Sequence, residues 1–191
     1  MANRLTQITT GVGDSGTTRL ADGKEVSKSS LRICAIGAVD ELNAAIGMFV
    51  AAYQLIDEQK LYEYEDIAAC CHQVQNELFN VGGELASPSN HFMSDSAISD
   101  IEHFIESIND SLPPLREFVI PGQNVASANA HFARCVARRA EREVIKLSEQ
   151  ETVSTDLLIY LNRLSDAFFI IARVTGRLDS KTEPQWHKSS V

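Results

Sequence analysis

Cysteines are scarce in this chain, and they follow no recognisable pairing pattern. The four cysteines include no C-x-x-C pair, and Cys34, Cys71 and Cys135 have mainly apolar neighbours in the sequence. Disulfide frameworks and zinc sites need regularly spaced cysteines. The sequence therefore predicts buried free thiols in a reducing compartment.

Long apolar runs and an excess of basic residues are also missing. No uninterrupted apolar run approaches the ~18 residues of a membrane-spanning helix, and no apolar stretch of signal-peptide type follows the first residues. The chain has 17 basic and 26 acidic residues, a net charge of −9. This balance argues against nucleic acid and acidic membranes as partners. We expect a soluble cytoplasmic protein that binds neither.

Metal clusters are not indicated. Ferritin-like bundles need Glu-x-x-His on paired helices, and none of the five histidines follows a glutamate by three residues. The nearest case is Asp100 before His103. The sequence therefore argues against a resident ferritin-like or zinc centre.

Helical periodicity dominates the 191 residues, with apolar side chains three and four residues apart. It predicts one all-α domain, a bundle of four long helices and a shorter one. The helices are expected from about Ser30 through Phe49 and at about 58–85, 95–109, 124–150 and 154–178, within a bundle of residues 31–178. Residues 1–30 are expected to be a polar loop, ordered only where a ligand holds it, with at most a short strand or hairpin at Leu5–Thr10. Residues 179–191 are expected to be an irregular tail.

The helix expected at 124–150 carries four arginines within nine residues. Its apolar stripe comprises Phe132, Val136, Ala140, Val144 and Leu147. Arg134, Arg138 and Arg142 recur every four residues on the opposite side, with Glu141 among them. Such a stripe is usually a solvated surface, yet three guanidiniums in a row also suit phosphates, which they bind with paired N–H donors. Periodicity alone leaves both interpretations open.

The stretch Thr-Thr-Gly-Val-Gly-Asp-Ser-Gly-Thr-Thr at residues 9–18 is rich in glycine. Gly11, Gly13 and Gly16 match G-x-G-x-x-G by letter, but no strand–helix–strand unit surrounds them, so we reject a dinucleotide-binding turn. The P-loop spacing is also present, but Thr17 stands where that loop needs lysine. Two interpretations remain: a mobile surface turn, or an anion site in which backbone N–H groups, hydroxyls and Lys28 face phosphate.

Two polar groups interrupt the helices. Asp40 and Glu41 lie in the middle of the first helix, and Asn162 shares one helical face with Asp166 and Phe169 in the last. Asp and Asn are mildly unfavourable inside helices and usually have partners there. We expect the partner to be a structural arginine within the bundle or a ligand.

Three blocks of this sequence, in order, resemble the PduO-type ATP:corrinoid adenosyltransferases. The blocks are Thr10–Thr18 with Lys28 and Gly37–Asn43; Phe118–Gly122 with His131–Arg134 and Arg138–Arg142; and Tyr160–Asp166. The resemblance covers nearly the whole chain, and three ordered blocks are far more specific than one. The chain departs from the family at Gln123, where a second glycine is usual, and at Ala130, where a leucine is usual.

The resemblance implies a five-helix bundle that assembles as a homotrimer with active sites between subunits. It implies transfer of the 5′-deoxyadenosyl group of ATP to the cobalt of cob(I)alamin or a related corrinoid, with Mg²⁺, giving adenosylcobalamin and triphosphate. It further implies a reductase that supplies electrons to cobalt and an adenosylcobalamin-dependent enzyme that receives the product. The alternatives from other classes are a non-catalytic nucleotide or corrinoid carrier or chaperone of the same fold, and a plain helical scaffold.

The resemblance also implies roles for individual residues. Asp40 would pair with Arg134 across the subunit interface and shape the corrinoid pocket. Phe118 would press on the lower face of the corrin, with Phe169 nearby. Together with Arg138, which would contact phosphates, Asp40, Arg134 and Phe118 form the expected catalytic set. The residues expected to bind ATP are Thr10, Gly11, Val12, Gly13, Asp14, Ser15, Gly16, Thr17, Thr18, Lys28, Arg138, Arg139, Glu141, Arg142 and Asn162, with Glu141 also near Mg²⁺.

Cobalt(I) is itself a nucleophile, so this reaction needs no catalytic serine, cysteine or histidine from the protein. The protein must orient C5′ of ATP over cobalt and stabilise the charge that grows on the departing triphosphate. Arginines, a lysine and a metal ion suit the second task. The chain also lacks the Asp-x-His-x-x-Gly pattern with which corrinoid-carrying enzymes supply a histidine to cobalt.

Overall fold

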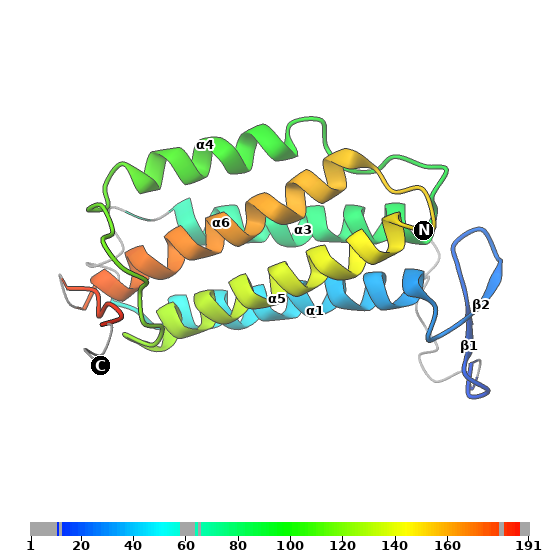
Figure 1. Ribbon diagram of the computed structural model, residues 1–191, viewed down its shortest axis with the longest axis horizontal. Helices are drawn as coiled ribbons and strands as arrows, with labels where there is room; N and C mark the ends of the chain where they lie inside the picture. The colour runs from blue at the N-terminus through cyan, green and yellow to red at the C-terminus, as the bar shows by residue number, and fades with distance from the viewer. Residues whose placement is uncertain (1–10, 12, 58–63, 65, 180–181, 188–191) are drawn as a thin grey trace.

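The protein is a bundle of helices with a small hairpin beyond one end (Figure 1). The computed structural model describes residues 11, 13–57, 64, 66–179 and 182–187. Within them, strands β1 (Thr17–Arg19) and β2 (Glu25–Ser27) precede five helices: α1 (Leu31–Tyr53), α3 (Asp66–Ala86), α4 (Ala97–Asn109), α5 (Val125–Ser148) and α6 (Thr155–Arg177). The predicted five-helix, all-α architecture is confirmed.

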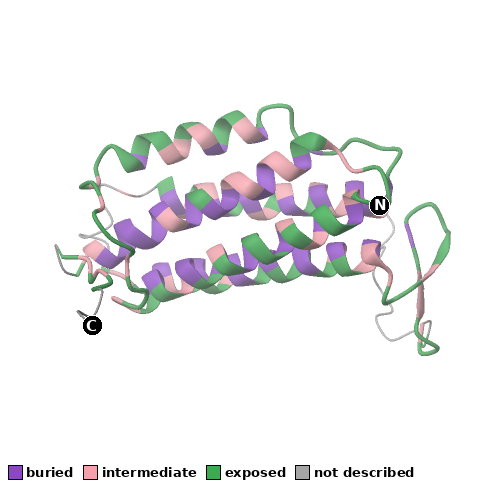
Figure 2. Ribbon diagram, in the orientation of Figure 1, coloured by how far each residue is buried: buried purple, intermediate pink, exposed green. Residues whose placement is uncertain are grey.

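The helices enclose one apolar core. α5 packs along both α1 and α6, α3 covers α1, and α4 lies on α6 with little contact to α3. Figure 2 shows buried residues on the faces that the helices turn toward one another. Phe49 of α1 and Phe168 of α6 are at most 1% exposed, and their rings meet edge to face with centroids 6.2 Å apart. Aromatic pairs favour this arrangement, so the two rings join α1 to α6.

Small side chains form the centre of the buried face of α5. Ala126, Ala130, Ala133, Ala137 and Ala140 are all at most 2% exposed. Phe132, which the periodicity placed in the core, is 48% exposed. That prediction was wrong because the buried face is centred on the alanines and extends to the side away from Phe132. Alanines let α1 and α6 approach α5 closely.

The second predicted helix begins later than expected. Residues 58–63 and 65 lie outside the described residues, but Tyr64 is not helical and α3 starts at Asp66, so a continuous helix from about Glu58 is wrong. The Tyr53 hydroxyl donates to the Tyr64 carbonyl over 2.8 Å, which holds the chain in a turn between α1 and α3. Asp66 then places a negative charge in the first turn of α3, where the helix dipole favours it.

The hairpin pairs residues 17–19 with 25–27 in antiparallel register, with Thr18 opposite Val26. Its turn contains Gly23 at a φ of 86°, and Asp22 accepts a hydrogen bond from the Lys24 amide over 2.9 Å. The Ala21 amide donates to the Ala86 carbonyl at the end of α3. The hairpin itself was not predicted, because its two strands are only three residues long; the predicted Leu5–Thr10 strand lies outside the described residues.

A buried arginine with a half-exposed carboxylate partner holds the end of the bundle nearest the hairpin. Arg32 of α1 is 4% exposed, and it binds Glu151 at 2.7 Å and the Leu85 carbonyl at 2.7 Å. Glu151 lies between α5 and α6, and Leu85 is near the end of α3. One guanidinium thus connects three segments, because its planar fork can donate in several directions at once.

α1 is also the one described helix that is long and apolar enough to cross a membrane, judged by length and composition. Within the bundle α3 and α5 pack against it, and Leu42, Ile46 and Phe49 are fully buried. A core helix of a bundle has this composition because it is surrounded by other helices. We therefore interpret α1 as the central core helix.

The four cysteines are free, as predicted, but they are not uniformly buried. Cys71 is 1% exposed, and burial raises the pKa of its thiol well above the usual value. Cys34 and Cys135 are exposed, so the expectation that they are buried was wrong. Their neighbours in the sequence are apolar, but those neighbours lie on a different face of the helix.

Truncation of a core leucine should destabilise the bundle. Leu161 of α6 is fully buried, so Leu161→Ala should lower the free energy of unfolding by about 2–5 kcal/mol. Leu55, at 86% exposure, provides a matched control whose replacement by alanine should change stability by less than ~0.5 kcal/mol. Urea unfolding followed by circular dichroism measures both values, and equal values would contradict the assignment of the core.

Candidate functional site

Two arginines of the predicted stripe lie on the solvent side of α5, whereas the third, Arg134, is half-buried. Arg138 and Arg142 are exposed, and neither makes a hydrogen bond or ion pair with another residue in the described part of the chain. Arg139, one position away, is paired with Glu41 of α1. Two unpaired guanidiniums four residues apart on an acidic protein form a surface suited to an anion such as phosphate.

Two predicted ATP-binding residues from different helices are in direct contact. The side-chain amide of Asn162 on α6 donates to Glu141 Oε1 on α5 over 2.9 Å. The Asn162 oxygen accepts from Arg163, whose Nε donates to Glu102 of α4 over 2.6 Å. This contact holds the Glu141 carboxylate in one orientation and leaves its second oxygen without a protein partner among the described residues. A carboxylate oxygen held in this way fits Mg²⁺, which binds one or two carboxylates together with phosphates.

The described part of the glycine-rich loop has a tight backbone. Gly13 has a φ of 94°, and a Cβ there would lie 2.6 Å from the Thr17 carbonyl and 3.3 Å from Lys28 Nζ. Only glycine fits this position, and Lys28 lies directly beside it. The Gly16 amide donates to the Gly13 carbonyl, and the Lys28 amide to the Gly16 carbonyl. Thr10 and Val12 lie outside the described residues.

Asp40 and Arg134 do not pair within one chain. The Arg139–Glu41 contact sets the register of antiparallel α1 and α5, which places Asp40 about six residues, or ~9 Å along the axis, from the level of Arg134. Arg134 instead contacts the neighbouring Cys135 sulfur at 3.6 Å, and its Nε is buried without a hydrogen-bond partner among the described residues. A buried N–H without an acceptor is costly, so the Arg134 Nε would be stabilised by an acceptor from outside the isolated chain.

His131 is a site residue to which the sequence assigned no role. It is 4% exposed, and neither ring nitrogen has a partner in the described part of the chain. Its ring lies 6.3 Å from that of Phe169. Burial, and after it the Arg134 charge, lower the pKa of His131 to about 4, against the opposing effect of Glu183. The imidazole is therefore neutral at pH 7. In the sequence, His131 stood one helical turn before Arg134 and inside the second block of the family resemblance.

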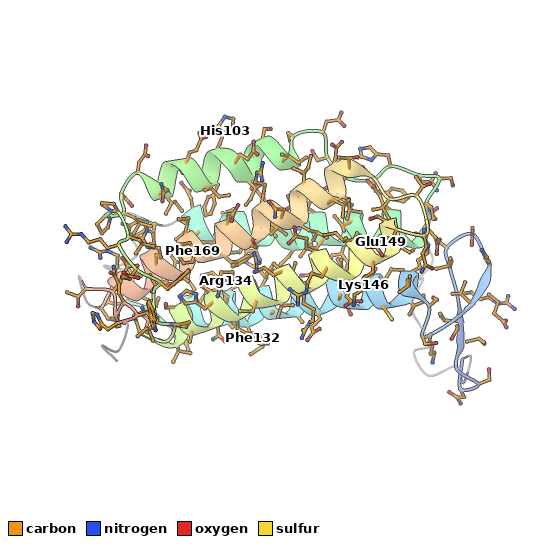
Figure 3. The ribbon with its side chains drawn as sticks, viewed as in Figure 1. His103, Phe132, Arg134, Lys146, Glu149 and Phe169 are labelled. Atoms are coloured by element: carbon orange, nitrogen blue, oxygen red, sulfur yellow. The ribbon has the colours of Figure 1, made fainter. Side chains whose placement is uncertain are left out.

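The predicted corrinoid residues Phe118 and Phe169 lie at the end of the bundle opposite the hairpin. Phe118 is 81% exposed, in the loop before α5, and lines an apolar pocket of about 350 Å³ with Val119, Ile120, Pro121 and Trp186. Phe169 is half-buried beside a hollow of about 490 Å³ that Arg173 also lines. Figure 3 shows Phe169 and Arg134 in the same half of the bundle.

The described part of the tail has no regular secondary structure, as expected, but it is docked on the bundle by specific contacts. Val119 pairs with Gln185 in an antiparallel bridge, and Glu183 is 3% exposed in ion pairs with Arg173 and Arg177. Gln123, where the chain departs from the family, donates to the Ile120 carbonyl over 2.9 Å and accepts from the Ser127 hydroxyl over 2.8 Å. These contacts were not predictable from periodicity because they join segments without regular secondary structure.

The other hollows contain few of the predicted residues. A cleft of about 520 Å³ between α3, α4 and α6 is lined by Cys70, Glu77, Tyr160 and others, none of them in the predicted sites. Asp40 lies at a hollow of about 410 Å³ between α1 and α3, beside Gly37 and Gly82. The described residues contain no group of three or more histidine, cysteine or acidic side chains suited to a metal ion. The candidate residues therefore lie in separate exposed places: on α5, in the glycine-rich loop and around Phe118.

The fold and these parts define a class of protein, an all-α bundle with unpaired arginines on an open helix face and a glycine-rich loop beside a lysine. The model of the cobalamin adenosyltransferase family matches residues 8–175. The chain therefore belongs to this family. A relative described as cobalamin adenosyltransferase, from Cupriavidus metallidurans, is 41% identical over 188 residues, which is 98% of each chain.

Solved structures agree with this placement. A variant of the PduO-type ATP:co(I)rrinoid adenosyltransferase from Lactobacillus reuteri complexed with ATP has a TM-score of 0.84 and 31% identity, covering 94% of this chain and 100% of that one. Another variant from the same organism, complexed with cobalamin and ATP, has a TM-score of 0.83 and 29% identity, covering 96% and 100%. The likeness extends over the bundle as a whole.

Burial of neutral His131 predicts a pH dependence of stability. Its folded-state pKa of about 4 is below the ordinary 6.5, so protonation favours unfolding. The contribution is complete above about pH 6.5 and is lost as the pH falls toward 4, by roughly 3 kcal/mol. His131→Gln should flatten this part of the stability profile, whereas His103→Gln, at an exposed position, should not. Unfolding midpoints between pH 4 and 7 measure the effect; a profile that is unchanged in His131→Gln would contradict it.

Proposed function

We propose that this protein transfers the 5′-deoxyadenosyl group of ATP to the cobalt of cob(I)alamin or a related corrinoid. The Co–C5′ bond forms with the electron pair of cobalt(I), and the C5′–O bond breaks, so that triphosphate leaves with its electrons. The observation that carries the proposal is the family match over residues 8–175, which includes nearly all the candidate site residues. One domain of residues 1–191 would provide the nucleotide loop (1–30), the bundle (31–178) and the tail (179–191).

The charged residues of α5 suit the departing triphosphate. Arg138 and Arg142 have no internal partner among the described residues, so they can bind phosphate oxygens as negative charge grows on them. Gly13 and Lys28 would present a backbone amide and an ammonium group to the same anion, and Arg139 could join them from its contact with Glu41. Glu141, oriented by Asn162, would hold Mg²⁺, which supplies charge neutralisation on the phosphates.

The corrinoid would lie near Phe118, Phe169 and Arg134. An exposed ring such as Phe118 can lie against the lower face of the corrin and exclude a lower axial ligand. Cobalt(II) that lacks this ligand is easier to reduce to the nucleophilic cobalt(I). The protein itself supplies no nucleophile, because the cobalt performs that part of the chemistry.

We also propose a homotrimer with the site between subunits. Arg134 has a buried, unpaired Nε, and Asp40 is exposed on α1, so the two could pair between copies. Met48 and Phe132, about half-exposed, lie at the same level of α1 and α5 by the Arg139–Glu41 register and provide an apolar surface for a neighbour. A cytoplasmic location, a reductase that supplies electrons to cobalt and an adenosylcobalamin-dependent acceptor enzyme complete the proposal.

The direct test is to incubate the purified protein with ATP, Mg²⁺, cobalamin and a strong reductant. Adenosylcobalamin, followed by its absorption spectrum, and triphosphate should appear in equal amounts. Binding of both ligands without product would favour the alternative, a non-catalytic carrier or chaperone of the same fold. Binding of neither would leave only a helical scaffold.

Replacement of Arg138 should affect catalysis much more than folding. Arg138→Ala should lower kcat/KM for ATP by about 100-fold or more, since a charge-assisted contact to the transition state is lost. The midpoint of thermal unfolding without ligands should stay within a few degrees, because Arg138 is exposed. Lys146→Ala is the matched control, an exposed cation on the same helix, and should retain activity. A large loss of stability in Arg138→Ala would instead indicate a structural arginine.

Replacement of Phe118 should separate the two cobalt oxidation states. Phe118→Ala should reduce the rate at least tenfold when the reaction starts from cob(II)alamin, because a lower ligand could then reach the cobalt. The rate from chemically prepared cob(I)alamin should change by less than about threefold, since cobalt(I) binds no lower ligand. Phe92→Ala, at another exposed phenylalanine, is the control. Equal losses from both starting states would contradict this role.

A further inference from the structure

The last described residues of the chain form a short strap over the loop that carries Phe118. The Ile120 amide donates to the Pro184 carbonyl, and the Trp186 amide donates to the Phe118 carbonyl, both over 2.8 Å. Val119 and Gln185 face each other between these two bonds. We call residues Glu183–Trp186 the C-terminal strap. It fixes the backbone of Phe118 directly.

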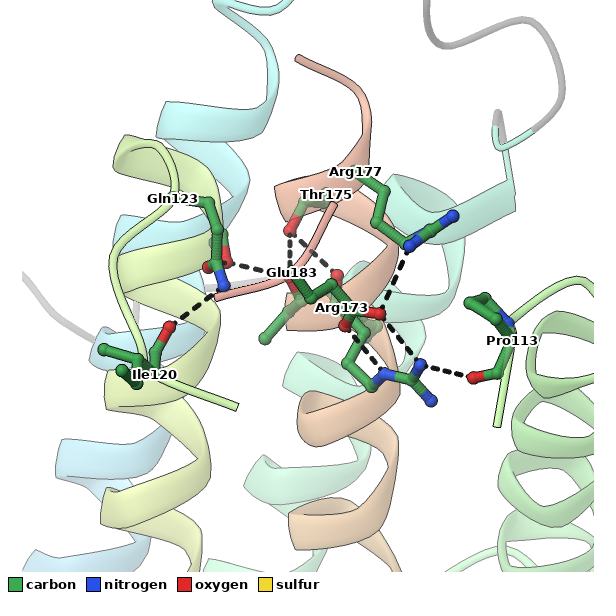
Figure 4. Close-up of polar contacts among 10 residues, drawn as sticks. Pro113, Ile120, Gln123, Arg173, Thr175, Arg177 and Glu183 are labelled. Carbon is green, nitrogen blue, oxygen red and sulfur yellow. Dashed lines mark hydrogen bonds and ion pairs between the residues drawn. The ribbon is translucent and has the colours of Figure 1, made fainter. Parts of the chain in front are cut away.

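A buried ion pair anchors this strap to the bundle (Figure 4). Glu183 accepts two hydrogen bonds from Arg173 of α6, at 2.8 Å from Nε and 2.9 Å from Nη2. The side chains of Arg173 and Glu183 are 4% and 3% exposed. Arg173 Nη2 also donates to the Pro113 carbonyl over 2.7 Å, and Arg177 reaches Glu183 at 3.3 Å. The pair therefore connects α6, the start of the Phe118 loop and the strap.

The position of Phe118 depends on these backbone contacts because its own side chain packs little. Phe118 is 81% exposed, so the bundle does not hold the ring in place. Release of the strap would leave the Arg173 guanidinium, which is 4% exposed in the docked state, without its carboxylate partner, so the ion pair favours docking. Gln123 holds the other side of the loop through the Ile120 carbonyl.

We propose that Arg173 and Glu183 are positioning residues that set Phe118 against the lower face of the corrinoid. This inference rests on the proposed function. The ion pair does not contact the corrinoid; it acts by holding the strap, which in turn holds the backbone of Phe118. Its loss should therefore impair the reaction from cobalt(II) without impairing ATP binding or the reaction from cobalt(I).

The chain contains its own reporter of strap docking. Trp186 is the only tryptophan in the sequence, and it is 46% exposed beside Phe118. Its fluorescence reports release of the strap without any corrinoid or ATP. Docking can therefore be measured even where adenosyl transfer fails.

The test compares full-length Glu183→Gln with Glu151→Gln, which weakens the partly exposed Arg32–Glu151 pair at the hairpin end of the bundle. In Glu183→Gln, Trp186 emission should shift to longer wavelength and acrylamide quenching should rise. The rate from cob(II)alamin should fall at least tenfold, whereas the rate from cob(I)alamin and the KM for ATP should change less than threefold. The electron paramagnetic resonance signal of four-coordinate cob(II)alamin, the form without a lower axial ligand, should weaken. Glu151→Gln should show none of these selective changes.

A second variant guards against misfolding of the first. Arg173→Met combined with Glu183→Gln removes the buried charge together with its partner, so the bundle should fold. It should show the same emission shift and the same selective loss. Unchanged Trp186 emission would refute the anchor, and a shifted emission with equal losses from both cobalt states would refute the positioning role. A wild-type protein that makes no adenosylcobalamin would refute the proposed function and this inference with it, while the emission shift would still establish the anchor.

Discussion

The contact of α5 with α1 and α6 through alanines is the constraint on which the arrangement of the site depends. Because Ala130, Ala133 and Ala137 occupy the centre of the buried face, the long polar side chains of α5 have to lie outside it. The same rotation of the helix turns Arg138 to solvent and brings Glu141 to the side chain of Asn162. The orientation of α5 that packs the core therefore also sets the positions of its charged side chains.

The two groups of candidate residues are separated along the bundle. The glycine-rich loop and the hairpin lie before α1, and the segment between α4 and α5 lies at the opposite end of the bundle, near the C-terminus (Figure 1). Lys28 follows the hairpin in the chain, and Phe118 belongs to the segment between α4 and α5. A helix of 23 residues such as α1 is about 35 Å long. No single ATP molecule next to a corrin could contact both ends of one chain, which supports a site shared between copies.

Helical periodicity was sufficient to predict the architecture and the direction in which the arginines of α5 point. It failed at Phe132, because a spacing of four residues does not distinguish the centre of a buried face from its margin. It also failed in the turn before α3, which the Tyr53–Tyr64 contact shapes. It correctly gave an irregular tail, but it did not predict that the Arg173–Glu183 contact docks the tail on the bundle. The burial of His131 could not be predicted from the sequence, since it depends on residues far away in the chain.

The separation of Lys28 from Phe118 has a genetic consequence. If each site combines the loop of one copy with the Phe118 end of another, a chain damaged at Gly13 and a chain damaged at Phe118 carry defects in different halves of a site. A mixed assembly of the two then contains some sites built from both intact halves. Two alleles that are each inactive alone would therefore complement each other in one cell. Two such alleles of a monomeric protein would not, because its chains share no site.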